Sequence, residues 1–281
     1  MTNARTLTTL FEGGNYFECP RWHDGRWWLS DFFRRVVLAV DTGSVVEEIV
    51  RVEGMPSGLG WAPDGSLLVV SMRDRRVLRA RNGKLELHAD LSELCDWHAN
   101  DMVVAPDGGA YVGNFGFDLG RAEPRATALV RVDPGGTAAR VAEELMFPNG
   151  CVLSDEGRTL IVAETWAARL TEFDVGADGA LSNRRTFAAI PRTAPDGCTL
   201  DAGGCVWFAD ARSNRCLRAA RGGEILDTVP VPDGLRCFAC MLGGDDGRTL
   251  ALCAASSYDE DKPHDAVVFT TRVEVPHAGR P

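Results

Sequence analysis

The sequence has no long apolar run and is poor in basic side chains. No stretch approaches the roughly 18 apolar residues that a membrane span needs, and the N-terminus lacks the apolar segment of a signal peptide. Only 30 basic residues stand against 40 acidic ones, so the formal net charge is −10 and a phosphate backbone would be repelled. These deficits predict a cytoplasmic protein that binds neither a membrane nor nucleic acid.

The motifs of several hydrolase and metal sites are also missing. There is no G-x-S-x-G sequence, and the five histidines have no triad context, which argues against a serine hydrolase. The nine cysteines are an odd number, which excludes a complete disulfide framework and predicts reduced, buried thiols. Cys237 and Cys240 form the one close pair, but no second pair stands at zinc spacing, which disfavours a metal or redox role.

A sixfold repeat is the main feature that the sequence does contain. An apolar strand, a turn centred on glycine and a second β-rich strand recur, as in PSGLGWAPDGSLLVVS and PNGCVLSDEGRTLIVAE. The turn glycines stand 40 to 49 residues apart and are Gly25, Gly65, Gly108, Gly157, Gly204 and Gly247. This spacing is typical of four-stranded propeller blades. It predicts an all-β protein in which residues 1–281 form a single six-bladed β-propeller domain.

The two ends of the chain each contain a strand-like segment without a hairpin partner. These segments are residues 6–14 and 266–275, and pairing them within one blade would close the ring and remove open sheet edges. Residues 116–127 are rich in turn-forming and charged residues and are predicted to form a loop over the channel mouth. The acidic residues 257–267 lack apolar periodicity and are predicted to form a mobile surface loop rather than a metal site.

One position of the repeat is unexpectedly polar. It lies eight residues before the turn glycine, or seven in the first copy, and its residues in chain order are Glu18, Ser57, Asn100, Asn149, Asp196 and Ala239. The innermost strands of a propeller line its axis, so these side chains should form a ring at one height. Two carboxylates and two carboxamides suit Ca²⁺ or a similar divalent ion, whereas the ring has no histidine or cysteine for a zinc-type site.

A simpler interpretation of these polar residues is that they serve turns. Asn, Asp and Ser before Gly are common turn formers, and any one of them alone is more often a turn or cap than a ligand. If these residues only formed turns, all six copies should have similar residues at this position. The first copy, however, has Glu18 before Cys-Pro, and the last has Ala239. From the residues alone both interpretations stay open.

Several longer motifs stand in order between about residues 10 and 275: FECPRW, HANDMVVAPDG, FPNGCVLSDEGRTLIVAET, APDGCTLDAGGCVWFAD and RCFACMLGGDDGRTL. They resemble the family of senescence marker protein 30, gluconolactonase and luciferin-regenerating enzyme. The resemblance implies a six-bladed propeller with one divalent metal ion in its central channel and, commonly, hydrolysis of lactones. It implies Glu18, Asn149 and Asp196 as metal ligands. For this oxygen-rich set Ca²⁺ is the first choice, and Mg²⁺, Mn²⁺, Fe²⁺ or Zn²⁺ are alternatives.

The resemblance also implies residues that bind substrate. Asn100 matches an asparagine that completes the metal environment or contacts substrate. Two residues earlier, members that act on sugar lactones tend to carry an arginine, whereas this chain has His98, which argues against a gluconolactone-like substrate. His98 is either a donor to a substrate oxygen or a packed bystander. Asn114 and Phe115, beyond the hairpin of the same blade, are predicted to line the pocket.

The sequence therefore predicts a metal-dependent lactonase that acts on a small-molecule lactone or ester. The ion would polarise the carbonyl, and Asp196 would accept a proton from the attacking water. Two alternatives remain: an aryl ester or phosphotriester hydrolase with the same site, and a non-catalytic binding propeller in which the ion ties the blades together. A monomer or a small homo-oligomer is expected.

Overall fold

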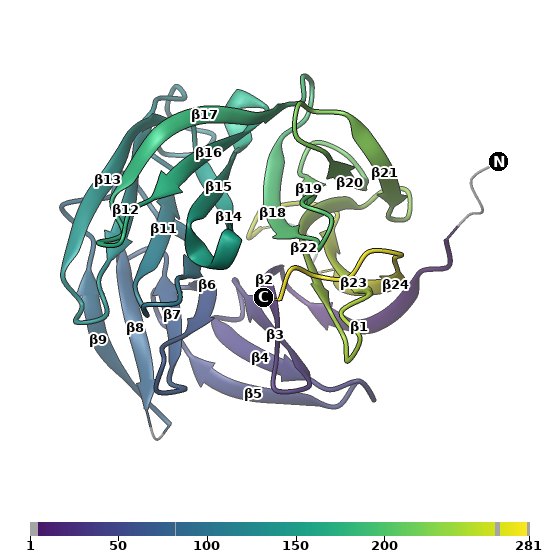
Figure 1. The fold of residues 1–281 in the computed structure, drawn as a ribbon. Helices are drawn as coiled ribbons and strands as arrows, with labels where there is room; N and C mark the ends of the chain where they lie inside the picture. Colours follow the sequence, from purple (N-terminus) through teal and green to yellow (C-terminus); the bar gives the residue numbers. More distant parts are fainter. Residues whose placement is uncertain (1–4, 82, 262–264, 280–281) are drawn as a thin grey trace.

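The six predicted blades are present in the protein. The computed structural model describes residues 5–81, 83–261 and 265–279. Within these ranges the chain forms 24 strands in six four-stranded antiparallel sheets, arranged as blades around a common axis (Figure 1). The described helices are the single turns η1 (Asp155–Gly157) and η2 (Thr165–Ala167), and neither is long or apolar enough to cross a membrane. The prediction of an all-β six-bladed propeller is confirmed.

Blades 1 to 5 each use four consecutive strands, in order from the axis outward. Blade 1 contains β2 (Phe17–His23), β3 (Arg26–Asp31), β4 (Val36–Val40) and β5 (Val46–Arg51). Blade 2 contains β6 (Pro56–Trp61), β7 (Leu67–Ser71), β8 (Arg76–Arg81) and β9 (Lys84–Asp90). Blade 3 contains β10 (Ala99–Val104), β11 (Ala110–Asn114), β12 (Thr127–Val132) and β13 (Ala138–Leu145).

The next two blades repeat this order. Blade 4 contains β14 (Pro148–Ser154), β15 (Thr159–Glu164), β16 (Arg169–Val175) and β17 (Leu181–Ala189). Blade 5 contains β18 (Pro195–Leu200), β19 (Val206–Asp210), β20 (Arg215–Ala219) and β21 (Ile225–Pro230). Apolar side chains fill the spaces between neighbouring blades, as where Tyr111 of blade 3 and Phe173 of blade 4 belong to one buried cluster. All nine cysteines are buried and free of disulfides, as predicted.

Blade 6 joins the two ends of the chain. Its strands are β22 (Arg236–Gly243), β23 (Thr249–Ala255), β24 (Ala266–Arg272) and β1 (Thr8–Gly14). β1 pairs with β24 in antiparallel register, with Thr8 opposite Thr270 and Gly14 opposite Ala266. This pairing confirms the predicted closure of the ring by the two terminal segments. The observed strands are shorter than the predicted ranges at one end each.

The six predicted turn glycines lie in the hairpins between the first and second strands of the blades. All six have a positive φ, between 71° and 93°, which glycine adopts without steric strain. Each hairpin lies at the far end of its inner strand. The residues that begin the inner strands therefore gather at the opposite end of the channel from these turns.

Neighbouring blades approach closely at the glycines of the Pro-x-Gly motifs. The inner strands of successive blades contact one another around the whole ring, including β22 against β2. A Cβ atom on Gly150 would lie 2.6 Å from the backbone oxygen of Asp196 and 2.7 Å from the backbone nitrogen of Cys198. A Cβ atom on Gly197 would lie 2.6 Å from that of Ala239. Blade packing therefore requires glycine directly after Asn149 and Asp196.

Replacing Gly150 with Ala should destabilise the protein by about 1–3 kcal/mol, because the new methyl group meets backbone that cannot rotate away. Urea denaturation measures the change in the free energy of unfolding. Gly135→Ala is the matched control, since a Cβ atom there has nothing within 4 Å. Equal effects of the two substitutions would contradict the packing explanation.

Candidate active site

The four ring residues with a carboxylate or carboxamide side chain each occupy the second position of an inner strand. They are Glu18 in β2, Asn100 in β10, Asn149 in β14 and Asp196 in β18. In each of these strands the pairing with the second strand shifts register at this point, as between Pro195 and Cys198 in β18. A β-bulge of this kind bends the strand and redirects a side chain. The bulges explain how residues of a paired strand present their side chains to the channel.

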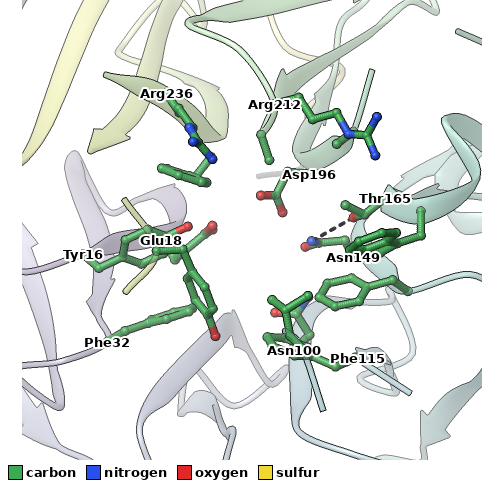
Figure 2. A pocket seen from close by; sticks show the side chains of 17 residues that line it. Tyr16, Glu18, Phe32, Asn100, Phe115, Asn149, Thr165, Asp196, Arg212 and Arg236 are labelled. Carbon is green, nitrogen blue, oxygen red and sulfur yellow. Dashed lines mark hydrogen bonds between the residues drawn. The ribbon is translucent and has the colours of Figure 1, made fainter. Parts of the chain in front are cut away.

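The four side chains meet at one cavity of about 290 Å³. Figure 2 shows Glu18, Asp196 and Asn149 directed toward a common space, with Asn100 beside it. They come from blades 1, 3, 4 and 5, so they meet only because the ring closes. The ring predicted from the repeat is thus present as a geometric arrangement.

Two buried carboxyl groups dominate the electrostatics of this cavity. Burial raises the pKa of Glu18 well above its ordinary value, and repulsion by Asp196 raises it further. Burial also raises the pKa of Asp196, Asp101 adds repulsion, and a hydrogen bond from Asn149 opposes the rise. Burial raises the pKa of Tyr16 as well, and Glu18 and Asp196 add to that effect. Neither Glu18 nor Asp196 forms an ion pair with any side chain that the structure describes, so the two carboxylates have no direct partner charge, although the exposed Arg212 and Arg236 also line the cavity.

The amide side chains add further oxygen atoms. Asn149 Nδ2 donates to Thr165 Oγ1 at 3.2 Å, which orients this amide. Asn100 Oδ1 accepts a long bond of 3.4 Å from Ser57 Oγ, while its buried Nδ2 has no partner. Turning the Asn100 amide over would let Nδ2 donate to Ser57 and place the oxygen where a partner is missing.

This donor set fits a hard divalent cation. Among the described residues no group of three or more His, Cys, Asp and Glu side chains could hold a metal ion. A cation in the cavity would therefore bind the two carboxylates together with amide oxygens. Carboxylate and carbonyl oxygens are the ligands that Ca²⁺, Mg²⁺ and Mn²⁺ prefer.

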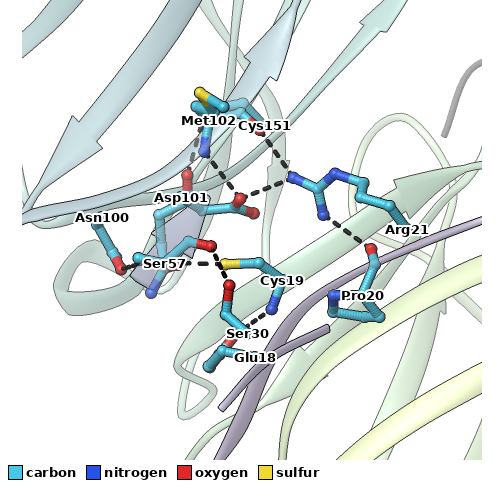
Figure 3. A network of polar contacts seen from close by, with 11 residues as sticks. Glu18, Cys19, Pro20, Arg21, Ser30, Ser57, Asn100, Asp101, Met102 and Cys151 are labelled. Atoms are coloured by element: carbon cyan, nitrogen blue, oxygen red, sulfur yellow. Dashed lines mark hydrogen bonds and ion pairs between the residues drawn. The ribbon is translucent and has the colours of Figure 1, made fainter. Parts of the chain in front are cut away.

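A buried ion pair lies next to the ring and was not predicted. Arg21 Nη2 donates to Asp101 Oδ1 at 2.7 Å and to the backbone oxygen of Met102 at 2.7 Å (Figure 3). Arg21 Nη1 donates to the backbone oxygen of Pro20 at 2.9 Å. Because blade 2 lies between the blades of these residues, the pair ties blade 1 to blade 3 across the channel. The sequence signal was present, since Arg21 belongs to FECPRW and Asp101 follows Asn100 in the Asn-Asp motif.

The predicted substrate residues divide into two groups. Phe115 lines the cavity, as expected. Asn114 does not: its Nδ2 donates to the backbone oxygen of Ala128 and its Oδ1 accepts from Thr127 Oγ1, so its amide is used inside the blade. His98 is also absent from the cavity lining; its ring stacks on Trp97 and makes a T-shaped contact with Phe115. The structure therefore does not bring His98 and Asn114 to the site.

The two predicted loops contribute to the cavity. Leu119 of the segment 116–127 lines it, which agrees with a loop at the channel mouth. The prediction of a plain surface loop at 257–267 was wrong for Tyr258, which is half-buried and lines the cavity, and for Ala266 and Val267, which belong to β24. The acidic residues 259–261 are exposed, and residues 262–264 lie outside the described ranges.

Most of the apolar lining was not predicted, although the repeat contained a signal for it. Two positions before the ring residue stand the lining residues Tyr16, Phe147 and Ala194. Directly after the second strand stand the lining residues Phe32, Phe115, Thr165 and Ala211. Aligning these two positions, in addition to the ring position, would have identified these residues.

The fold and the site together define a class of protein: a six-bladed propeller whose axial cavity collects carboxylates and amides from several blades. The chain belongs to the SMP-30/gluconolactonase/LRE-like family, whose family model matches residues 17–256. The resemblance seen in the sequence motifs is thereby confirmed.

Individual relatives agree with this assignment. The chain is 32% identical over 161 residues to 6-deoxy-6-sulfogluconolactonase from Pseudomonas putida, covering 54% of this chain and about half (55%) of that protein. It is 26% identical over 293 residues to pentonolactonase XacC from Haloferax volcanii, covering 100% of this chain and 97% of the relative. The crystal structure of regucalcin from Agrobacterium tumefaciens, described as a calcium-binding protein, superposes with a TM-score of 0.83 at 22% identity, covering 99% and 97% of the two chains.

Proposed function

We propose that this protein is a metal-dependent lactonase that hydrolyses a cyclic ester in the axial cavity. The observation that carries the proposal is the convergence of Glu18, Asp196, Asn100 and Asn149 on one cavity in which neither buried carboxylate forms an ion pair with a described residue. The lactonase activity of 6-deoxy-6-sulfogluconolactonase and pentonolactonase XacC supports the reaction class.

In this proposal Glu18, Asn149 and Asp196 hold one divalent cation, and Asn100 completes its environment or contacts substrate. Ca²⁺ is the first choice, which the likeness to the calcium-binding regucalcin supports. When bound, the cation polarises the lactone carbonyl as a Lewis acid and offsets the charge of the two carboxylates.

The residues of the chain then position the water and its proton. Asp196 accepts a proton from water while the water oxygen bonds to the carbonyl carbon. Asp196 is the candidate for this role because it is a buried carboxylate that faces the cavity (Figure 2). The ring C–O bond breaks, and the leaving alkoxide takes up the proton, so that the product is a hydroxy acid.

Chelation should abolish turnover and lower the melting temperature, because the two carboxylates then repel each other without a counter-charge. Re-addition of Ca²⁺, Mg²⁺, Mn²⁺, Fe²⁺ or Zn²⁺ in turn identifies the ions that restore activity. The assay uses a panel of lactones, aryl esters and phosphotriesters.

Three results would contradict the proposal in different ways. Full lactone turnover in chelated protein would show that hydrolysis does not require the metal ion. Faster turnover of an aryl ester or phosphotriester than of any lactone would change the substrate class. A metal-dependent melting temperature without hydrolysis of any ester would favour a non-catalytic binding propeller.

A further inference from the structure

The wall of the cavity around the polar ring residues is mostly aromatic. Its large apolar or aromatic side chains are Tyr16, Phe32, Phe115, Leu119, Phe147, Trp166, Phe238 and Tyr258. The Tyr16 ring lies 4.9 Å from that of Phe238 and 5.2 Å from that of Tyr258, and the rings of Phe115 and Phe147 lie 4.4 Å apart. These contacts make continuous apolar surfaces along blades 6 and 1 and along blades 3 and 4.

Apart from the hydroxyls of Tyr16 and Tyr258 and two arginine side chains, few groups in this wall are able to bind the hydroxyls of a sugar lactone. Thr165 Oγ1 already donates to the backbone oxygen of Pro195 at 2.7 Å and accepts from Asn149. His98 lies outside the lining. A hydroxyl that loses water without gaining a partner weakens binding, whereas an apolar substrate body gains by leaving water. The lining therefore favours a substrate with an apolar body over a polyhydroxylated ring.

Two arginines stand on one side of this cavity without a partner in the described part of the chain. Arg212 of blade 5 and Arg236 at the start of β22 both line the cavity and are exposed (Figure 2). No hydrogen bond or ion pair joins either guanidinium to another described residue. Arg215 differs, because it pairs with Asp210 at 3.2 Å. An exposed guanidinium group without a partner is suited to bind an anion.

We propose that the natural substrate is a lactone with an apolar body and an anionic group, such as a carboxylate, at its outer end. This inference rests on the proposed lactonase function. The ring residues Glu18, Asn149 and Asp196, with the cation proposed among them, are assigned to the lactone carbonyl, so the anion is assigned to Arg212 and Arg236. The aromatic wall of the same cavity holds the apolar body.

The test compares matched probes. The substrates are an alkyl-substituted δ-lactone that ends in a carboxylate, its methyl ester, and glucono-1,5-lactone. The binding probes are the cyclic ether analogues of the first two, which cannot be hydrolysed, with affinity measured by calorimetry. The variant is Arg212→Gln/Arg236→Gln. The control is Arg158→Gln, which removes a positive charge from an exposed residue in the hairpin between β14 and β15, at the other end of the channel.

We expect the wild type to favour the acid over its methyl ester by at least about tenfold in kcat/KM and in affinity, mainly through KM, and to favour both over glucono-1,5-lactone. The preference for the acid should fall as salt is added and approach unity in the double variant, while Arg158→Gln retains it. Equal use of acid and ester by the wild type, or a preference for the acid that survives in the double variant, would overturn the inference. Calorimetry separates the two proposals: a preference for the acid ether without hydrolysis of any lactone would refute the lactonase and retain the anion site.

Discussion

Asp196→Asn should lower kcat on any lactone that the wild type opens by about 10²–10⁴-fold, the usual contribution of a general base. Asparagine keeps the size of the side chain and one oxygen donor, but it cannot accept the proton of the attacking water. Without metal, this variant should be at least as stable as the metal-free wild type, because one of two mutually repelling buried carboxylates is gone. Initial rates at saturating metal and thermal unfolding after chelation measure the two effects.

Two further variants distinguish the role of general base from the role of metal ligand. Glu18→Gln replaces a charged metal ligand with a neutral, weaker one and keeps the base, so high metal concentration should restore much of its turnover, whereas Asp196→Asn should stay inactive. Asp245→Asn, at an exposed position in the turn before β23, is the matched control and should behave as wild type. Wild-type turnover in Asp196→Asn would show that Asp196 is not the general base.

Arg21→Met should destabilise the protein by about 3–5 kcal/mol, because it leaves the Asp101 carboxylate buried without its partner. Both side chains of this ion pair are almost fully buried, with 6% and 5% of their surfaces exposed. Two backbone oxygens, of Pro20 and Met102, also lose a donor. Urea denaturation of the metal-loaded proteins measures the loss.

The double variant Arg21→Met/Asp101→Leu tests the cause of that loss. If an uncompensated charge is responsible, removing Asp101 as well should recover a large part of the stability. A double variant that is less stable than Arg21→Met would show that packing around Arg21, rather than charge, carries the effect.

Much of the site could be predicted because the repeat gives every residue a defined place in its blade. The turn glycines mark the hairpins, and counting back from them identifies Glu18, Asn100, Asn149 and Asp196 at one height. Their meeting at one cavity follows from sixfold repetition alone, since inner strands line the axis. The metal and the chemistry assigned to these residues remain proposals.

Other features depend on side-chain packing that no repeat encodes. His98 occupies the same repeat position as Tyr16 and Phe147, yet it contacts Phe115 without lining the cavity, whereas they do line it. Asn114 bonds within its own blade, and Tyr258 reaches the cavity from a segment whose composition indicates only a surface loop.

The sequence by itself therefore determined the blade number, the closure of the ring and the oxygen-bearing residues on the axis. These follow from local hairpins at a regular spacing, and a hairpin is specified by residues close together in the chain. Only the tertiary structure decided which side chains form the aromatic wall, that Arg21 pairs with Asp101, and that Arg212 and Arg236 stand unpaired at the cavity within the described chain. Those contacts join residues from different blades, and their distances are set when the closed ring packs the blades together.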